Sequence, residues 1–476
     1  MASHLTAAAK QQLPIRCLGP PWGPADILKA LQPGTLPSEL DSMMLGGWVR
    51  GQVWNRACEA GEEVARSVAA QVLHMDIEAL LQAIMPWYEP LMRSRRLQSW
   101  RSSGDRLDIL CFDGNAKLHR RSCGAPCAES RFVPSLDLHL VRGCPESPQQ
   151  QGVLCSHHAA LRSRTDLAAQ ISKHRMVQPL SSSPFLELEV QLAGFQQRWQ
   201  PACTVPADTL QAYFAVHGGD VVEARKEKRA AQRESQRRPV RYPLLGDWSS
   251  ESTKTKCACK THKESMAAVK TASRSAGFLL AVSQSGIIAG LQEIITAETL
   301  SQRYAFLAEM AEATPELKGS VHDDNCHVRL FSKTHRREDN AMSKRLSSPD
   351  FFYIIDRPHS RGHVDAVCRS ECFPDVPRNS DFLRDFPTPV CETVNSEMSP
   401  LAHTIHHMQR WLCMFCVNEC ADVHNELRAQ RREEARMRQE KKRAREERAA
   451  SRARAPRAII KAGACRLAAP AEGGAG

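Results

Sequence analysis

The chain has few aromatic residues and no long uninterrupted apolar segment. Aromatic residues make up 6% of its 476 residues. The longest apolar candidate, residues 277–295, is interrupted by polar residues at 283, 284, 285 and 292. It therefore falls short of the roughly 20 apolar residues that a membrane-spanning helix needs. Residues 1–24 contain several prolines and lack the apolar region of a secretory signal. These absences argue against a membrane protein and predict an intracellular one.

Cysteine and positive charge, in contrast, are abundant. Because intracellular compartments are reducing, disulfides explain the 18 cysteines poorly, and zinc ligation of a subset is the better expectation. The formal net charge of +11 favours a polyanionic partner, of which nucleic acid is the usual one. A soluble protein with a basic tail is the simpler alternative, and charge alone does not exclude it.

The hydrophobic pattern predicts an α/β protein. Apolar runs and helical periodicity predict helices over 48–100, 299–313 and 392–423, strands over 107–112, 320–322 and 351–355, and a hairpin over 278–295. Without the long segment 119–273, this is the element order of a ribonuclease-H-like core. We therefore expect a flexible leader (1–47), a helical region (48–104), a mixed-sheet core (105–118 and 274–424), a zinc-bearing insertion after the first strand (119–273), and a basic charged helix with a disordered tail (425–476).

Acidic residues stand where the core elements begin or end. Asp113 ends the first strand, Asp323 and Asp324 end the fourth, and Glu392 opens the last long helix. Strand ends and helix starts in an open α/β sheet face a common crevice. Carboxylates gathered there repel one another until they bind divalent metal, and two Mg²⁺ or Mn²⁺ ions held there catalyse phosphoryl transfer.

Each acid also has a purely structural explanation. Asp113 is followed by Gly and Asn, a common turn, and Asp323 or Asp324 can cap a helix. Their joint placement at matching element ends is what favours a catalytic site, and which of the two adjacent aspartates serves as the ligand stays open.

Five segments in chain order resemble Kyakuja–Dileera–Zisupton (KDZ) transposases. They are residues 108–123 (DILCFDGNAKLHRRSC), 257–280 (with CACKTHKE and RSAGFLL), 321–329 (VHDDNCHVR), 359–372 (with HSRGHVDAVC and a further cysteine) and 391–397 (CETVNSE). The similarity covers about two thirds of the chain, and it implies a DDE-type transposase that cuts and joins DNA at a two-metal site. Carried over to this sequence, the triad is Asp113, Asp323 and Glu392, with Asp324 and Glu397 in reserve.

The third motif departs from the family pattern. Cys391 precedes Glu392 where the family has a glycine, and the next glutamate is Glu397 rather than one three residues on. This departure keeps a second interpretation open, namely a domesticated, catalytically inactive derivative that retains the fold for zinc and DNA binding. A zinc-dependent interaction module with no DNA role is a third.

Two groups of cysteine and histidine are candidate zinc sites. The first, Cys123, Cys144, Cys155 and His158, ends in a tight Cys-x2-His pair, and Cys127 or His157 can substitute within it. It lies in a proline-rich region with little core, to which a metal would add stability. The second group comprises Cys257, Cys259, His363, Cys368 and Cys372. Scattered free thiols are the alternative for both, and a catalytic role for Cys326 beside His327 has no supporting spacing.

Two basic segments complete the prediction. Residues 225–241 carry eight Lys or Arg with Trp248 nearby, and residues 425–456 carry 12 Lys or Arg with 6 Glu. Either can neutralise DNA phosphates, and the second also resembles a nuclear localisation signal. A solvated charged helix is the simpler interpretation of the second segment. The sequence therefore predicts a nuclear, DNA-binding enzyme with Mg²⁺ or Mn²⁺ in its active site and structural Zn²⁺, and its candidate partners are DNA and further copies of the chain.

Overall fold

A computed structural model defines most of the chain. It describes residues 38–115, 117–124, 129–149, 153–163, 171–177, 185–191, 198–202, 205, 207–217, 259, 274–295 and 298–464. Residues 225–241, Trp248, Cys127 and Cys257 lie outside these ranges, so the predictions that concern them are not addressed by the structure.

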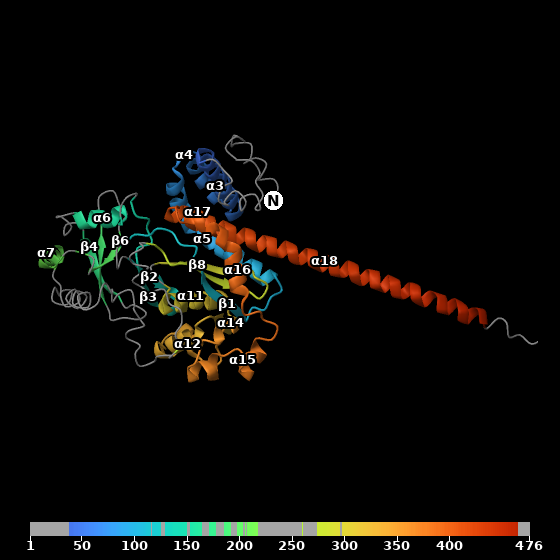
Figure 1. Ribbon diagram of the computed structural model, residues 1–476. Helices are drawn as coiled ribbons and strands as arrows, with labels where there is room; N and C mark the ends of the chain where they lie inside the picture. Colours follow the sequence, from blue (N-terminus) through green and yellow to red (C-terminus); the bar gives the residue numbers. More distant parts are fainter. Residues whose placement is uncertain are drawn as a thin grey trace, which may run out of the picture. The chain divides into compact units, whose positions relative to one another are not determined.

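A five-stranded mixed sheet forms the centre of the fold (Figure 1). Its strands, in spatial order, are β10 (Phe352–Ile355), β9 (Gly319–His322), β1 (Ile109–Asn115), β7 (Gly277–Val282) and β8 (Ile288–Ile294). Strands β1, β9 and β10 run parallel, whereas β7 is antiparallel to both β1 and β8. The prediction of a mixed α/β protein is confirmed, as is the hairpin over 278–295.

Both faces of this sheet are buried. Side chains alternate along a strand, so Leu110 and Phe112 of β1 enter one hydrophobic cluster while Ile109 and Cys111 enter the other. The first cluster packs under α11 (Leu300–Ala313), α12 (Asn325–Thr334) and α13 (Ala341–Ser347). The second packs under α16 (Val390–Met398) and the start of α18 (Arg410–Ala464). Burial on both faces explains the nearly continuous apolar runs of the strands.

The N-terminal helices have a core of their own. They are α3 (Ser38–Ala60), α4 (Glu62–His74) and α5 (Ile77–Ser102), and they pack around Phe415 of α18. Beside that core, Arg56 donates to Glu419 at 2.8 Å and to Asp422 at 2.7 Å, and all three side chains are at most 9% exposed. Because buried charges need partners, this ion-pair cluster fixes the N-terminal helices against α18.

The insertion between β1 and β7 contains two small sheets. Strands β2 (Glu129–Val133) and β3 (Leu138–Arg142) pair as one, and β4 (Ile171–Val177), β5 (Phe185–Val190) and β6 (Arg198–Pro201) as the other. The described helices are α6 (Ser156–Ser163) and α7 (Ala207–His217). Leu188, Tyr213 and Phe214 contribute to a separate hydrophobic cluster that includes β4, β5 and α7.

The segment from β10 to α18 is more broken than the sequence suggests. The short helices α14 (Arg357–Ser360), η7 (Cys368–Cys372) and α15 (Pro377–Phe382) precede α16, and η8 (Ser399–Leu401) and α17 (Ala402–Ile405) follow it. The prediction of one helix over 392–423 is therefore wrong. Pro400 lacks a backbone N–H and cannot continue a helical hydrogen-bond ladder, so α16 ends at Met398.

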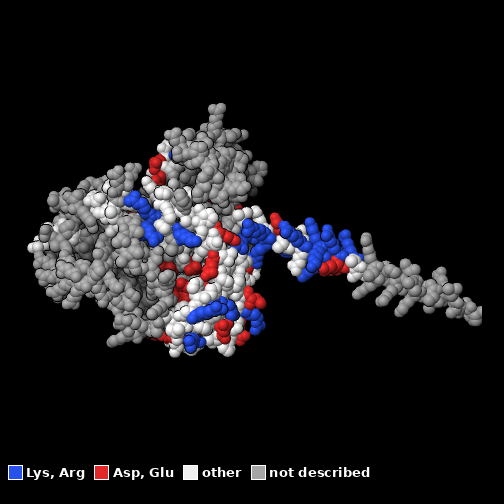
Figure 2. Space-filling model, in the orientation of Figure 1, with Lys and Arg blue, Asp and Glu red and all other residues white. Residues whose placement is uncertain are grey.

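The chain divides into two compact units, Met1–His424 and Asn425–Gly476. In the second unit, residues 425–450 of α18 are mostly exposed and carry ion pairs one turn apart, such as Arg436–Glu433 and Arg438–Glu434. Figure 2 shows Lys and Arg side chains gathered along this helix. Among the described helices, none combines the length and low charge needed to cross a lipid bilayer.

Candidate active site and metal centres

Three aspartates lie at one edge of the central sheet. Asp113 is near the end of β1, Asp323 follows β9, and Asp356 follows β10. Because these strands run parallel, their carboxyl ends meet at the same edge, where ligands bind in open α/β sheets. The sequence pattern identified Asp113 and Asp323. Asp356 obeys the same rule, but we did not predict it.

The carboxylate of Asp113 accepts hydrogen bonds from its own strand, β1, and from α16. Its Oδ1 accepts from the Gly114 backbone N–H at 2.8 Å, and its Oδ2 accepts from the side-chain amide of Asn395 at 2.8 Å. Burial raises the pKa of Asp113 to about 7, and the negative charges of Asp323 and Glu298 add to the effect, while His322 opposes it. The surroundings of Asp113 therefore favour the protonated form of its carboxyl group more than water does.

Glu298, which the sequence reasoning missed, also reaches this site. A Cβ atom on Gly114 would collide with the Glu298 carboxylate, so the glycine allows this carboxylate to lie against β1. The Oε1 atom of Glu298 lies 3.4 Å from Nε2 of His322 and 3.4 Å from Nε of Arg303. No strand end or motif marks Glu298, because it lies in the segment before α11.

The adjacent aspartates after β9 have different surroundings. Asp324 is buried, and Arg303 and His322 together hold its pKa well below the usual range although burial acts to raise it. Its Oδ2 accepts from Arg303 at 3.0 Å. Asp323 keeps 39% of its side chain exposed while it pairs with His322. The geometry thus favours Asp323 as the ligand that faces solvent and Asp324 as the partner of Arg303.

The charges of this cluster do not balance. When ionised, Asp113, Asp323, Asp324 and Glu298 carry four negative charges. The positive charges are those of Arg303 and of His322, whose pKa lies well above its usual value because its carboxylate neighbours outweigh the effect of burial. Four negative and two positive charges leave a net charge of −2. Such an excess is relieved by a proton on Asp113 or by a divalent cation.

Glu392 lies in a neighbouring group with Asp356 and His359. The Nδ1 atom of His359 lies 2.8 Å from Oδ2 of Asp356, and its Nε2 lies 3.8 Å from Oε1 of Glu392. Burial acts to lower the pKa of His359, but the hydrogen bond and charge of Asp356 raise it overall, with smaller contributions from Asp323 and Glu392. The pKa of His359 is thus affected by the charges of both candidate ligands, Asp323 and Glu392.

Two of the three predicted carboxylates, Asp323 and Glu392, fall in separate groups, and Asp113 is in neither. Among the described residues, the sets whose donor atoms lie within 4.8 Å of one another place Asp323 with His322 and Asp324, and Glu392 with Asp356 and His359. Helix α16 also contacts Asp113, because Asn395, one turn after Glu392, donates to its carboxylate. Glu397 is 3.3 Å from His424 instead, which favours Glu392 over Glu397 for the site.

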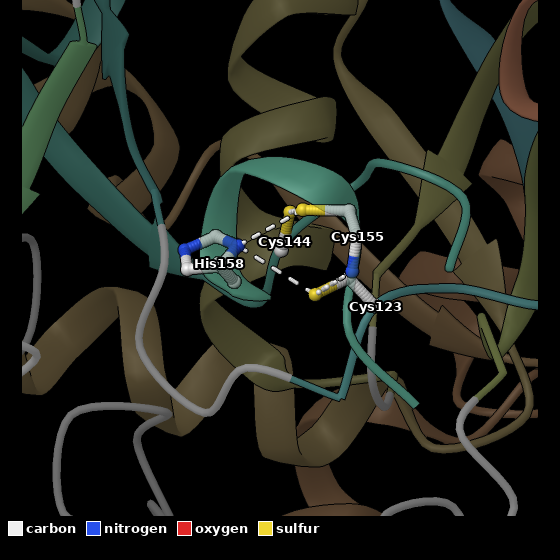
Figure 3. Close-up of side chains that lie close together, drawn as sticks. All are labelled: Cys123, Cys144, Cys155 and His158. Carbon is white, nitrogen blue, oxygen red and sulfur yellow. Dashed lines mark hydrogen bonds between the residues drawn. The ribbon is translucent and has the colours of Figure 1, made fainter. Parts of the chain in front are cut away.

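The first cysteine–histidine cluster converges as predicted (Figure 3). The Nδ1 atom of His158 lies 3.2 Å from Sγ of Cys155 and 3.6 Å from Sγ of Cys123, and the Cys144 and Cys155 sulfurs are 3.9 Å apart. Tetrahedral zinc with about 2.3 Å bonds to sulfur places neighbouring sulfurs about 3.8 Å apart. The four donors could therefore hold a metal ion and are compatible with zinc. His158, rather than His157, supplies the nitrogen.

Comparison of the chain with protein-family models, with curated proteins and with solved structures found no match.

The second cluster differs from the predicted ligand set. Cys259, His363 and Cys368 place their donor atoms within 4.8 Å of one another and could also hold a metal ion. Cys372 is buried but is not part of that set. Cys326, which the sequence reasoning set aside, has its sulfur 3.4 Å from Nδ1 of His363. Spacing gave no signal for Cys326, because the fold alone brings it beside His363.

Proposed function

We propose that this chain is a DDE-type DNA transposase, or a domesticated derivative, that cuts and joins DNA by two-metal-ion phosphoryl transfer. The observation that carries the proposal is that Asp113 and Asp323 lie at the carboxyl ends of adjacent parallel strands, beside the helix that bears Glu392. Asp113 lies in the middle strand, Asp323 follows its parallel neighbour, and Glu392 lies on the helix whose Asn395 binds Asp113.

The strand order supports a ribonuclease-H-like core. Strands β1, β7 and β8 form a consecutive antiparallel set, and β9 and β10 then extend it in parallel on the other side of β1. With the insertion removed, the chain runs through these five strands before it reaches α16. This is the element order that the sequence predicted for such a core. The acidic residues of the KDZ-like motifs lie near the ends of β1 and β9 and at the start of α16.

The burial and hydrogen-bond partners of each residue suggest a separate role for it. Asp113 and Asp323 would hold the metal ions, with Glu392 completing the site from α16. Two Mg²⁺ or Mn²⁺ ions bound there would activate an attacking hydroxyl and stabilise the leaving oxygen. Arg303 and His322 hold the Asp323–Asp324 segment in place, and the net charge of −2 attracts the cations. His359, oriented by Asp356, would pair with Glu392.

The remaining features fit a nuclear, DNA-binding protein. Zinc in the Cys123 cluster would stabilise an insertion whose local core is small. The exposed basic residues of α18 would contact DNA phosphates or act as a nuclear localisation signal. Assembly as a homo-oligomer would bring two such sites to two DNA ends.

A plasmid cleavage assay tests the proposal. Full-length protein should nick supercoiled DNA with Mg²⁺ or Mn²⁺ and not with Ca²⁺, whose looser coordination does not position the attacking oxygen. Asp113→Asn should abolish nicking while DNA binding, measured by fluorescence anisotropy, is retained. Nicking that persists in Asp113→Asn, or that requires no divalent ion, would contradict the proposal.

A catalytically inactive transposase-derived scaffold is the second candidate. It is favoured by the pairing of Glu392 with His359 in a group separate from Asp323, and by Cys391 in place of glycine. This candidate predicts salt-dependent DNA binding and a full zinc content without metal-dependent cleavage of any plasmid, hairpin or single strand.

A further inference from the structure

A buried group of sulfur and nitrogen atoms lies directly behind the Asp323 backbone. Cys326 lies in the first turn of α12, Cys368 lies in η7, His363 lies between α14 and η7, and Cys259 comes from the long segment between β1 and β7. All four side chains are at most 8% exposed. The Cys259 and Cys368 sulfurs are 3.4 Å apart, and the Cys326 sulfur is 3.4 Å from Nδ1 of His363.

His363 connects this group to the candidate active site. While its Nδ1 faces the sulfur of Cys326, its Nε2 lies 2.9 Å from the backbone carbonyl oxygen of Asp323. A carbonyl oxygen only accepts hydrogen bonds, so the contact is favourable when Nε2 carries the proton. In the neutral imidazole Nδ1 is then unprotonated and faces the sulfur group, which is the form that binds a metal.

We propose that Cys259, Cys326, His363 and Cys368 form a second structural zinc centre that positions Asp323 through His363. Metal on Nδ1 fixes the tautomer that donates from Nε2. The centre thereby holds the carbonyl of Asp323 and, through it, the direction of the Asp323 carboxylate. The positioning role rests on the proposed function, because it assumes that Asp323 binds a catalytic cation; the zinc centre itself does not.

Cys259, His363 and Cys368 place their donor atoms within 4.8 Å of one another. Cys326 lies outside that set but contacts its histidine, so it would move toward the two other sulfurs to become the fourth ligand. Zinc–sulfur and zinc–nitrogen bonds of about 2.3 and 2.0 Å predict a tetrahedral sulfur–nitrogen edge of about 3.6 Å, close to the Cys326–His363 separation. The centre would also join four segments that are far apart in sequence, including one from the insertion. Cys372, one turn after Cys368 in η7, is the matched thiol that should not contribute.

The first test counts zinc in purified full-length protein. Wild-type protein should carry two zinc ions per chain, and X-ray absorption should give an average of three sulfur ligands and one nitrogen ligand per zinc. His363→Ala and Cys326→Ala should each lose one zinc, whereas Cys372→Ala and Cys420→Ala, a buried thiol of α18, should keep both. A wild-type content of one zinc that falls to none in Cys155→Ser and is unchanged in His363→Ala would overturn the second centre.

The second test separates metal binding from positioning. His363→Cys supplies a sulfur in place of the imidazole, so both zinc ions should remain, but the hydrogen bond to the Asp323 carbonyl is gone. Mn²⁺ affinity, measured by the EPR signal of the free ion, should weaken about tenfold, in the range seen when partners of metal ligands are removed. Cys420→Ala should bind Mn²⁺ like wild-type protein.

The outcomes distinguish the two proposals. If wild-type protein carries two zinc ions but binds no Mn²⁺, the proposed function fails and the zinc centre stands without its positioning role. If Mn²⁺ binds equally well to wild-type protein and to His363→Cys with two zinc ions, the positioning role is wrong and the proposed function stands. Should His363→Cys fail to fold, the zinc counts and the ligand average of wild-type protein still decide whether the centre exists.

Discussion

Replacing Asp113 by asparagine should stabilise the protein in the absence of divalent cations. The pKa of Asp113 rises from 3.8 to about 7 in the folded protein, chiefly because the carboxyl group is buried. At about 1.4 kcal/mol per pKa unit, a fully buried group would lose roughly 4 kcal/mol of stability between pH 4 and pH 7. Asp113 is partly accessible to solvent, so screening should reduce this cost to about 2–3 kcal/mol.

The sign follows from proton linkage. A raised folded-state pKa means that the folded protein binds the proton more tightly than the unfolded chain. This contribution is complete below pH 3.8, where both states are protonated, and is lost as pH rises to about 7. Asparagine carries no charge, so Asp113→Asn avoids the loss. Its amide would, however, meet the amide of Asn395, which now donates to Asp113, at a cost of about 1 kcal/mol.

Urea unfolding of both proteins at pH 5 and pH 8, in buffer free of Mg²⁺ and Mn²⁺, measures the balance. Asp113→Asn should be about 1–2 kcal/mol more stable than wild-type protein at pH 8, and the advantage should shrink or reverse at pH 5. Mn²⁺ at 100 times its Kd should add about 2.7 kcal/mol to wild-type protein and little to the variant. An Asp113→Asn variant that is less stable by the same amount at both pH values would refute this reasoning.

Four further results are expected. Glu392→Gln should abolish Mn²⁺-dependent nicking, whereas Glu397→Gln, the matched neighbour on α16, should retain it and lose at most about 1 kcal/mol of stability; the reverse result would show that the third ligand is misassigned. Arg56→Ala should cost about 3 kcal/mol in urea unfolding, because Glu419 and Asp422 lose a buried cationic partner, although Tyr88 still donates to Glu419 and Arg95 still pairs with Asp422; a cost below 1 kcal/mol would contradict this reasoning. Cys155→Ser should lose one zinc and increase hydrogen exchange in β2 and β3 but not in β7 and β8; equal zinc content in the two proteins would exclude the first centre. Deleting residues 425–476 should flatten the dependence of log K on log salt for DNA binding, and an unchanged slope would mean that α18 does not contact DNA.

The sequence was informative where local patterns decide the structure. Apolar runs ending in acidic residues located β1 and β9 together with Asp113 and Asp323. The tight Cys155–His158 pair correctly marked the first cysteine–histidine cluster, because neighbouring ligands leave a spacing signal. The hairpin of β7 and β8 was equally clear from its two apolar runs and the turn between them.

Contacts made over long sequence distances were beyond such patterns. Only the fold reveals that Arg303 pairs with Asp324, whereas the side chain of Asp323 is partly exposed to solvent. Glu298 reaches the site from an irregular segment, and Cys326 meets His363 across 37 positions of sequence. The split of the predicted 392–423 helix was foreseeable from Pro400, but the periodic apolar residues on both sides concealed it.

The central claim is that Asp113, Asp323 and Glu392 together hold divalent cations, and anomalous diffraction from crystals of the full chain grown with Mn²⁺ tests it most directly. The account predicts two manganese peaks about 4 Å apart, with Asp113 and Asp323 on the first and Asp113 and Glu392 on the second. Peaks confined to the Asp356–His359–Glu392 group, or no manganese within bonding distance of Asp113, would contradict it.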